Sequence, residues 1–321
     1  MNKAHPAISV VMSVFNGEAY LEEAICSVLD QSMQDFELIV IDDGSTDSTG
    51  KILECFEDPR LKTLKQANQG LTRSLNTGIA MAKGEYIARM DADDLSHPER
   101  LLRQYEEMQR RPDLALLGTW SILIGETGKE LEKKKLPVGI DEIKSSIFLT
   151  NPFVHGSMMF RKQALNSVSG YRDAFIYAQD YDLALRINEQ YEIDNLPEYL
   201  YLSRHNLEMI SVQQYGKQHA FAELARTLRA ERDKQGNDAL DRGAYVGDLL
   251  QDDRQYEDGV VEYYRNIISA KSRQGKTHEA RSAVASLLKL TPFTPKLWAI
   301  GLATFFGSKG MRMITRVWDG R

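Results

Sequence analysis

The chain of 321 residues has little cysteine and no long apolar run. Its two cysteines, Cys26 and Cys55, are too few for a disulfide framework or a thiolate metal site, and they suit the reducing cytosol. No apolar run approaches the roughly 20 residues that a membrane-spanning helix needs. The first apolar run also lacks the basic region and cleavage site of a signal peptide, so we expect a cytoplasmic protein.

An excess of positive charge is missing as well. The 46 Asp and Glu residues outnumber the 40 Lys and Arg residues, which gives a net charge of -6. Proteins that act on nucleic acid normally carry a basic surface, so we expect no nucleic acid partner. The length is sufficient for a large core with an appended segment.

Short aliphatic runs alternate with helical periodicity as far as about residue 120. This alternation is typical of an α/β domain with a largely parallel sheet flanked by helices. Residues 122–128 suggest a hairpin, and the charged stretch 129–135 suggests a solvated loop or ribbon edge. Beyond residue 211 strand patterns end, and helix patterns cover residues 217–232, 238–250, 258–273 and 276–290. We therefore predict a catalytic domain over residues 1–215 and a helical C-terminal extension over residues 216–321.

Carboxylates follow two of the predicted strands. Asp42 and Asp43 come after the apolar run 36–41, and Asp91, Asp93 and Asp94 come after the run 86–90. Strand ends in α/β sheets open onto ligands, and one or two carboxylates commonly hold magnesium or manganese together with substrate phosphates. We therefore expect a metal-bound diphosphate here. The alternative is that Asp93, Asp94 and Ser96 only cap a helix that starts near Pro98.

Four motifs in this order resemble the family 2 glycosyltransferases. They are Val-Phe-Asn at 14–16, Asp-Asp-Gly-Ser-x-Asp at 42–47, Asn-x-Gly-Leu at 68–71 with Asn-x-Gly-Ile at 76–79, and Asp-Ala-Asp-Asp at 91–94. The resemblance covers roughly residues 7–212. It implies a GT-A fold, a nucleotide-diphospho-sugar bound by the first half of the domain, an acceptor bound by the second half, and transfer with inversion.

The resemblance also implies roles for individual residues in the first half. Those expected to bind the nucleotide are Ser13, Phe15, Asp42, Asp43, Arg73 and Asp91. Asp91 is expected near the ribose or the water shell of the metal, and Asp93 is expected to ligate Mn²⁺ or Mg²⁺ directly. For Arg73, a solvated charge on a helix face is an equal alternative to a phosphate contact.

In the second half, the motif Gln-Asp at 179–180 precedes a helical pattern. Inverting transfer needs a base that takes the proton of the acceptor hydroxyl, and the resemblance implies that this base is Asp180. The alternative is that Asp180 and Asp182 are only first-turn acids of the helix. Three further residues are candidate contacts to the diphosphate or the acceptor: His155, Arg204 and His205.

We therefore predict an inverting, metal-dependent glycosyltransferase of polysaccharide biosynthesis. The expected donor is a UDP-sugar, by family frequency, and the expected acceptor is a glycan or a lipid-linked glycan. A sugar nucleotidyltransferase and a non-catalytic nucleotide-sugar-binding scaffold are the alternatives. Aromatic and basic residues in 296–321 suit either peripheral contact with the inner face of the membrane or a buried terminal helix.

Overall fold

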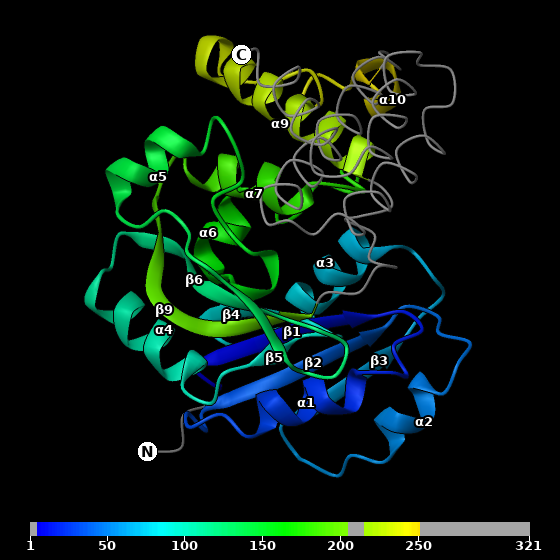
Figure 1. Ribbon diagram of the computed structural model, residues 1–321. Helices are drawn as coiled ribbons and strands as arrows, with labels where there is room; N and C mark the ends of the chain where they lie inside the picture. The colour runs from blue at the N-terminus through cyan, green and yellow to red at the C-terminus, as the bar shows by residue number, and fades with distance from the viewer. Residues whose placement is uncertain (1–4, 205–214, 251–321) are drawn as a thin grey trace, which may run out of the picture. The chain divides into compact units, whose positions relative to one another are not determined.

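The computed structural model describes residues 5–204 and 215–250 (Figure 1). By contacts, the chain divides into two compact units: residues 1–207 with 225–242, and residues 208–224 with 243–321. The first unit contains all nine strands described below. His205, the predicted helices at 258–273 and 276–290, and the segment 296–321 lie outside the described residues. The predicted domain boundary at residue 215 stays a prediction.

The strands, in chain order, are β1 (Ile8–Val14), β2 (Phe36–Asp42), β3 (Leu61–Lys65), β4 (Tyr86–Asp91), β5 (Leu95–Ser96), β6 (Leu114–Ile124), β7 (Glu130–Lys134), β8 (Met159–Arg161) and β9 (Glu192–Arg204). The helices are α1 (Leu21–Leu29), α2 (Thr49–Glu54), α3 (Leu71–Met81), α4 (Arg100–Arg110), α5 (Ile140–Ser146), the 3-10 turn η1 (His155–Ser157), α6 (Lys162–Ser167), α7 (Gln179–Ile187), α9 (Tyr215–Gln235) and α10 (Val246–Leu249).

All nine strands belong to one sheet with the order β3-β2-β1-β4-β8-β6-β9-β5, and β7 pairs with β6 outside this path. Strands β3, β2, β1 and β4 are mutually parallel, as are β6 and β9. The short strand β8 runs antiparallel between β4 and β6. The predicted fold class, a largely parallel sheet flanked by helices, is confirmed.

Helices cover both faces of the first strands (Figure 1). On one face, Val10 and Met12 of β1 belong to the same buried cluster as Ala24 and Ile25 of α1. On the other face, a Cβ atom at Gly78 of α3 would lie 2.5 Å from Cγ1 of Val11, so this helix approaches the sheet closely. The apolar periodicity of β1 and α1 thus builds a rigid base for the loops that follow the strands.

Most local predictions hold, and one is wrong. The expected hairpin forms between β6 and β7, and the charged stretch is the exposed edge strand β7. The helix predicted over 238–250 is wrong, because residues 238–243 form turns around Asp238 and only Val246–Leu249 is helical. Both cysteines are free and exposed.

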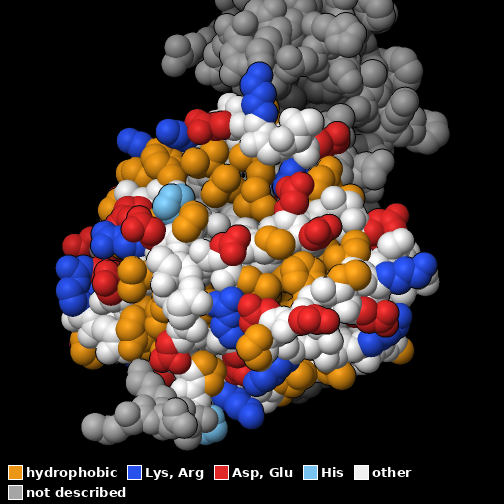
Figure 2. All heavy atoms as spheres, turned by 90° about the horizontal axis from the view of Figure 1, so that it is seen from below, with side chains coloured by type: hydrophobic (Ala, Val, Ile, Leu, Met, Phe, Trp, Pro, Cys, Tyr) orange, Lys and Arg blue, Asp and Glu red, His pale blue; other side chains and the backbone are white. Residues whose placement is uncertain are grey.

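No helix among the described residues is long and apolar enough to span a membrane. Figure 2 shows one face of the molecule, where acidic and basic side chains are interspersed with apolar ones.

Candidate active site

The register of the parallel strands brings the predicted loop residues to one edge of the sheet. Ser13 of β1 pairs with Asp91 of β4, and the next residue, Val14, pairs with Asp42 of β2. Phe15 follows at the same edge with 53% of its surface exposed. The three strand ends expected to bind a nucleotide are therefore neighbours.

Asp43 organises the loop that precedes α3. Its carboxylate accepts hydrogen bonds from the side chain of Gln66 (2.8 Å) and from the backbone N–H groups of Gln69 (2.9 Å) and Gly70 (2.8 Å). Burial raises the pKa of the Asp43 carboxyl, but these hydrogen bonds outweigh burial and hold the pKa below its usual range. Asp43 is therefore ionised and fixes the 66–70 loop beside the end of β1.

Asp42 is buried but keeps one oxygen free of hydrogen bonds. Its Oδ1 accepts a hydrogen bond from the backbone of Ser45 (2.8 Å), whereas its Oδ2 has no hydrogen-bond partner among the described residues. The exposed ammonium group of Lys65 lies 3.7 Å from that oxygen. A buried acceptor without a hydrogen bond at a strand end is suited to a ligand donor such as an imide N–H.

Arg73 lies on α3 and forms an exposed ion pair with Asp173 (3.0 Å). Three residues further along the helix, the side-chain amide of Asn76 bonds both the N–H and the C=O of Tyr171. These contacts attach α3 to the segment that precedes α7. In this arrangement the Arg73 charge is at the surface and already has a carboxylate partner.

The end of β4 holds a buried ion pair. Arg89, which is 3% exposed, pairs with the carboxylate of Asp91. The Tyr201 hydroxyl accepts the backbone N–H of Asp91 (3.2 Å) and donates to its Oδ2 (3.3 Å). A Cβ atom at Gly156 would overlap that hydroxyl and lie 2.6 Å from Asp91 Oδ2, so glycine is needed for η1 to approach β4. The position of the Asp91 carboxylate is therefore fixed by Arg89, by Tyr201 and by the close approach of η1.

Among the aspartates at the end of β4, Asp93 makes fewer polar side-chain contacts than Asp91 and Asp94. Burial and the negative charge of Asp91 raise the pKa of Asp93 to about 6. Its neighbour Asp94 is buried and accepts the backbone N–H of Arg204 (2.6 Å). The capping alternative is wrong, because α4 begins only at Arg100 and has no side-chain cap.

The arrangement of these aspartates is compatible with a divalent cation that takes its remaining ligands from water and from a substrate phosphate. Among residues 5–204 and 215–250, no group of three or more His, Cys, Asp or Glu side chains could hold a metal on its own. However, Mg²⁺ and Mn²⁺ sites often use only one or two carboxylates and take the other ligands from water and phosphate. The pKa of Asp93 is raised first by burial and then by the negative charge of Asp91, and a cation bound there would favour the ionised carboxylate.

Arg204 is fully buried and already has protein acceptors. It donates to the carbonyl oxygens of Asp93 (2.8 Å) and Glu126 (2.7 Å) and to the carboxylate of Glu23 (2.8 Å). Its guanidinium also lies 4.2 Å from the ring centre of Tyr20. In this arrangement Arg204 supports the backbone of the aspartate loop and faces away from solvent.

His155 lies on η1 and is hydrogen-bonded to Tyr171, with 2.8 Å between Nε2 and the hydroxyl oxygen. Burial and the positive charge of Arg89 lower the pKa of the His155 ring well below its usual range. The ring is therefore neutral near pH 7 and serves as a hydrogen-bonding group. Tyr171, whose pKa is raised by burial, connects His155 to the segment before α7.

Asp180 is in the first turn of α7, directly after Gln179. The preceding Ala178 has a left-handed backbone (φ 50°), which is uncommon for a residue with a side chain and typical of functional sites. The Asp180 carboxylate accepts a hydrogen bond from the side chain of Asn151 (2.7 Å). Burial raises the pKa of Asp180, although the backbone of Tyr181 and the charge of Arg89 act in the opposite direction. A partly exposed carboxylate of raised pKa is suited to take up a proton.

Arg89 is a functional candidate that belongs to none of the sequence motifs: it pairs with Asp91, and its charge also acts on Asp180. Its charge lowers the pKa of both Asp93 and Asp180, so it lies within electrostatic reach of each. Its Nε has no hydrogen-bond partner among the described residues. The sequence did carry a signal, because a charged residue inside the apolar run 86–90 is costly to bury unless it is paired.

Asp182, the other first-turn acid of α7, is fully buried. Its carboxylate accepts a hydrogen bond from Arg186 (2.8 Å) and lies 3.7 Å from Arg172. We expect Asp182→Asn to lower the free energy of unfolding by about 3 to 5 kcal/mol, because it leaves buried charges without their partner. Urea unfolding would measure this, with the exposed Asp173→Asn as a control that changes the free energy by at most about 1 kcal/mol. Equal stabilities of the two variants would contradict the structural role of Asp182.

Comparisons with known proteins agree with this geometry. The family described as Glycosyl transferase family 2 matches residues 9–169. The chain is 35% identical over 206 residues to the putative glycosyltransferase EpsE of Bacillus subtilis, covering 62% of this chain and 73% of that protein. It is 37% identical over 207 residues to the O-antigen biosynthesis glycosyltransferase WbnJ of Escherichia coli, covering 60% of this chain and 77% of that protein.

Two solved structures are similar in fold at 16% sequence identity. One is S. aureus TarS 1-349 in complex with UDP-GlcNAc, with a TM-score of 0.58 over 98% of this chain and 91% of that chain. The other is the mannosyltransferase PcManGT from Pyrobaculum calidifontis in complex with GDP-Man and Mn²⁺, with a TM-score of 0.55 over 99% of this chain and 89% of that chain. At this identity the two structures support the fold.

Proposed function

Because the chain belongs to glycosyl transferase family 2, we propose that it transfers a sugar from a UDP-sugar to a glycan or lipid-linked acceptor, with inversion at the anomeric carbon. The observation that carries this proposal is that the segment 151–157 lies against both groups of carboxylates. Asn151 donates a hydrogen bond to Asp180 (2.7 Å), and a Cβ atom at Gly156 would lie 2.6 Å from Asp91 Oδ2. A carboxylate group suited to a metal–diphosphate and a carboxylate suited to a base therefore belong to one site.

Asp180 is the proposed base. As the acceptor oxygen forms its bond to the anomeric carbon, the bond from that carbon to the diphosphate oxygen breaks, and the diphosphate leaves with the bonding electrons. The acceptor proton passes to Asp180, whose raised pKa makes it a stronger base than an ordinary carboxylate. Asn151 holds the carboxylate in place through its hydrogen bond. A single displacement of this kind inverts the configuration.

Asp93 is the proposed ligand of Mn²⁺ or Mg²⁺, and Asp91 lies beside it at the end of β4. When bound, such an ion supplies positive charge that stabilises the departing diphosphate. The residues of the chain contribute orientation: Arg89 and Tyr201 fix the Asp91 carboxylate. The neutral His155, hydrogen-bonded to Tyr171, is a proposed contact to the diphosphate or the acceptor.

Ser13, Phe15, Asp42 and Asp43 are the proposed nucleoside contacts. Their common edge of the sheet supports this assignment, as do the exposed ring of Phe15 and the Asp42 oxygen that has no hydrogen bond. The name of WbnJ refers to O-antigen biosynthesis, which supports a glycan acceptor. Both similar structures are complexes with nucleotide-diphospho-sugars, UDP-GlcNAc in TarS and GDP-Man in PcManGT, which supports a donor of this class; the uridine base is proposed from family frequency.

A donor panel tests the proposal. The full chain would be incubated with Mn²⁺ and UDP-GlcNAc, UDP-glucose, UDP-galactose or GDP-mannose, with and without candidate glycan and lipid-linked acceptors. Release of UDP together with a glycosylated product of inverted configuration is expected for one UDP-sugar. Tight donor binding without any turnover would favour the scaffold alternative, and a retained configuration would contradict the displacement.

The sugar nucleotidyltransferase alternative receives no support from the family match. That reaction also needs a basic, glycine-rich loop after the first strand to bind a triphosphate. The residues after β1 are instead Phe15, Asn16, Gly17 and Glu18. Their backbone is bonded to the side chains of the 45–49 loop, so these residues form a structural turn.

We expect Asp42→Ala and Asp43→Ala each to weaken the binding of UDP by roughly 10-fold to 100-fold, the usual contribution of one hydrogen bond to a charged group. Asp43→Ala should also lower the melting temperature, because it leaves the donors of the 66–70 loop unpaired. Calorimetry with UDP and Mn²⁺ would measure the affinity. Asp58→Ala, which removes a surface partner of Arg60, is the control. UDP affinities equal to that of the wild type in both variants would place the nucleoside elsewhere.

A further inference from the structure

Helix α7 carries the proposed base on one side and a buried ion cluster on the other. Every residue of α7 except Asp180 is buried. Asp180 and Asp182 are two positions apart, which is a rotation of roughly 200° about a helix axis, so their side chains point to opposite sides. Whatever holds Asp182 therefore also determines the direction in which Asp180 points.

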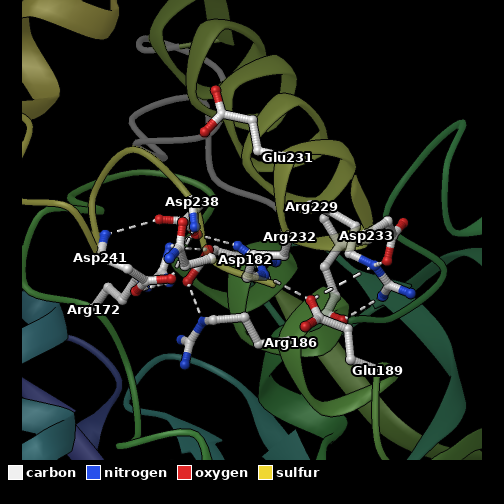
Figure 3. A network of polar contacts seen from close by, with 12 residues as sticks. Arg172, Asp182, Arg186, Glu189, Arg229, Glu231, Arg232, Asp233, Asp238 and Asp241 are labelled. Atoms are coloured by element: carbon white, nitrogen blue, oxygen red, sulfur yellow. Dashed lines mark hydrogen bonds and ion pairs between the residues drawn. The ribbon is translucent and has the colours of Figure 1, made fainter. Parts of the chain in front are cut away.

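Asp182 has two guanidinium partners. Arg186 of the same helix donates a hydrogen bond to it (2.8 Å), and Arg172, in an ion pair at 3.7 Å, joins it to a distant part of the chain (Figure 3). The Nη1 group of Arg172 lies 3.7 Å from Asp182 and 2.7 Å from Asp238, and its Nη2 group lies 2.9 Å from Asp241. Asp182 and Asp238 are both completely buried. One guanidinium thus bridges the base-bearing helix and the turn at residues 238–241.

The turn at residues 238–241 is itself fixed. Asp238 also pairs with Arg232 of α9, and the backbone N–H groups of Asp238 and Asp241 each donate to the carboxylate of the other residue. Arg232 in turn pairs with Glu189 (2.8 Å), directly after α7. The residues after 225 thereby hold both ends of α7 through charged groups.

Arg172 is also connected to the site through the residue that precedes it in the chain. It follows Tyr171, whose hydroxyl is hydrogen-bonded to His155. Arg186 of α7 donates to the carbonyl oxygens of Val168 (2.6 Å) and Gly170 (2.8 Å), which precede the same segment. Buried ion pairs add little net stability compared with apolar packing, and orientation is a role for which such pairs are retained.

We infer that Arg172 and Asp238 are positioning residues for the Asp180 base. Through Asp182 they fix the rotation of α7, and thereby the place of the Asp180 carboxylate relative to the acceptor. The inference rests on the proposed function, because it takes Asp180 as the base. It gives the segment 225–242 a part in the reaction, although the family match ends at residue 169.

The test compares Asp238→Asn with Glu231→Gln in the full chain. Glu231 belongs to the same segment and pairs with Arg242 (2.9 Å), but its side chain points away from the cluster (Figure 3). Both variants therefore remove one carboxylate charge from an Arg partner. Hydrogen exchange without ligand reports the protection of α7, and exchange in β1 and β2 reports whether the rest of the sheet is intact. Arg172→Lys, which keeps the charge but cannot bridge three carboxylates, is the second variant if Asp238→Asn does not fold.

We expect Asp238→Asn to speed exchange in α7 by at least about 10-fold and to leave β1 and β2 unchanged, as local opening requires. With the fastest donor of the panel, kcat should fall by roughly 10-fold to 100-fold, with the KM for the donor within about 2-fold of the wild type. Glu231→Gln should match the wild type in every measurement. Unchanged exchange in α7 of Asp238→Asn would overturn the inference, whatever the activity.

The double variant Asp180→Asn/Asp238→Asn separates positioning from general stability. If Asp238 acts through Asp180, the double variant should be no more than about 2-fold slower than Asp180→Asn alone. If the loss of kcat in the double variant equals the product of the losses in the two single variants, the positioning role is overturned. A slow Asp180→Asn beside a fully active Asp238→Asn would refute this inference only. A fully active Asp180→Asn would instead refute the proposed base, and with it the positioning role.

Discussion

Replacing Asp180 by Asn is expected to lower kcat by roughly 10² to 10⁴, the usual contribution of a positioned general base. Asn keeps the size of the side chain but cannot accept the proton of the acceptor. Because the carboxylate acts in the transition state, the KM for the donor should stay close to that of the wild type. Steady-state kinetics with the donor and acceptor found in the panel would measure both constants.

The pH dependence provides a second measurement of the same base. Burial raises the pKa of Asp180, and only the deprotonated carboxylate can take up a proton. The rate should therefore fall as the pH is lowered through this pKa, at a pH above the range of an ordinary aspartate. At saturating Mn²⁺ and donor, which keep Asp93 deprotonated, this acidic limb should be absent in Asp180→Asn. Asp173→Asn, an exposed carboxylate of the segment before α7, is the control and should leave both the rate and the limb unchanged. An Asp180→Asn enzyme with the turnover and pH profile of the wild type would exclude this base.

Replacing Asp93 by Ala is expected to abolish metal-dependent donor binding. Changes in groups that only support a metal ligand already cost 10-fold to 100-fold in affinity, so the loss of the proposed direct ligand should cost at least about 100-fold. The fold should be retained, because among the described residues no other side chain forms an ion pair with Asp93, and the loop is held instead by Arg204 and Asp94. Calorimetry of the UDP-sugar with and without Mn²⁺ would measure the effect.

The matched control for Asp93→Ala is Asp173→Ala, which removes a carboxylate with no place in the proposed metal site. It should retain the difference in affinity between titrations with and without Mn²⁺. If Asp93→Ala retains that difference as well, the metal is bound by other groups. If neither the wild type nor the variants respond to Mn²⁺, the enzyme binds its donor without a metal.

Local sequence patterns were sufficient to predict the sheet and the place of the strand ends. The apolar run 8–14 coincides with β1, and the runs 36–41 and 86–90 each lie one residue short of the observed strands. Because parallel strands with a right-handed crossover align their carboxyl ends, the neighbourhood of Ser13, Asp42 and Asp91 followed from their positions after the strands. The helix predicted over 238–250 was wrong because the side chains of Asp238 and Asp241 bond backbone groups and form turns, a competition that periodicity does not detect.

Long-range partners could not be predicted from such patterns. Arg204 was expected near a diphosphate, but its environment depends on Glu23 and on the 125–126 turn, which are far away in sequence. The same holds for the bond between Asn151 and Asp180, and for the bridge from Arg172 to Asp238. In each case the fold, and no local motif, determines which polar groups meet.

The order of the strands has a consequence for synthesis on the ribosome. Strands β1 to β4 can pair as soon as residue 91 has emerged, whereas β8 and β9 arrive much later and the turn at 238–241 later still. At roughly 5 to 20 residues per second, an interval on the order of ten seconds separates the first event from the last. Until β8 has been made, β4 is an unpaired edge strand, which is a template for aggregation, and an inward-pointing charge on such an edge discourages wrong pairing. Arg89 is such a charge, so the residue that pairs with Asp91 in the finished site is expected also to disfavour wrong pairing of β4 before β8 has been made.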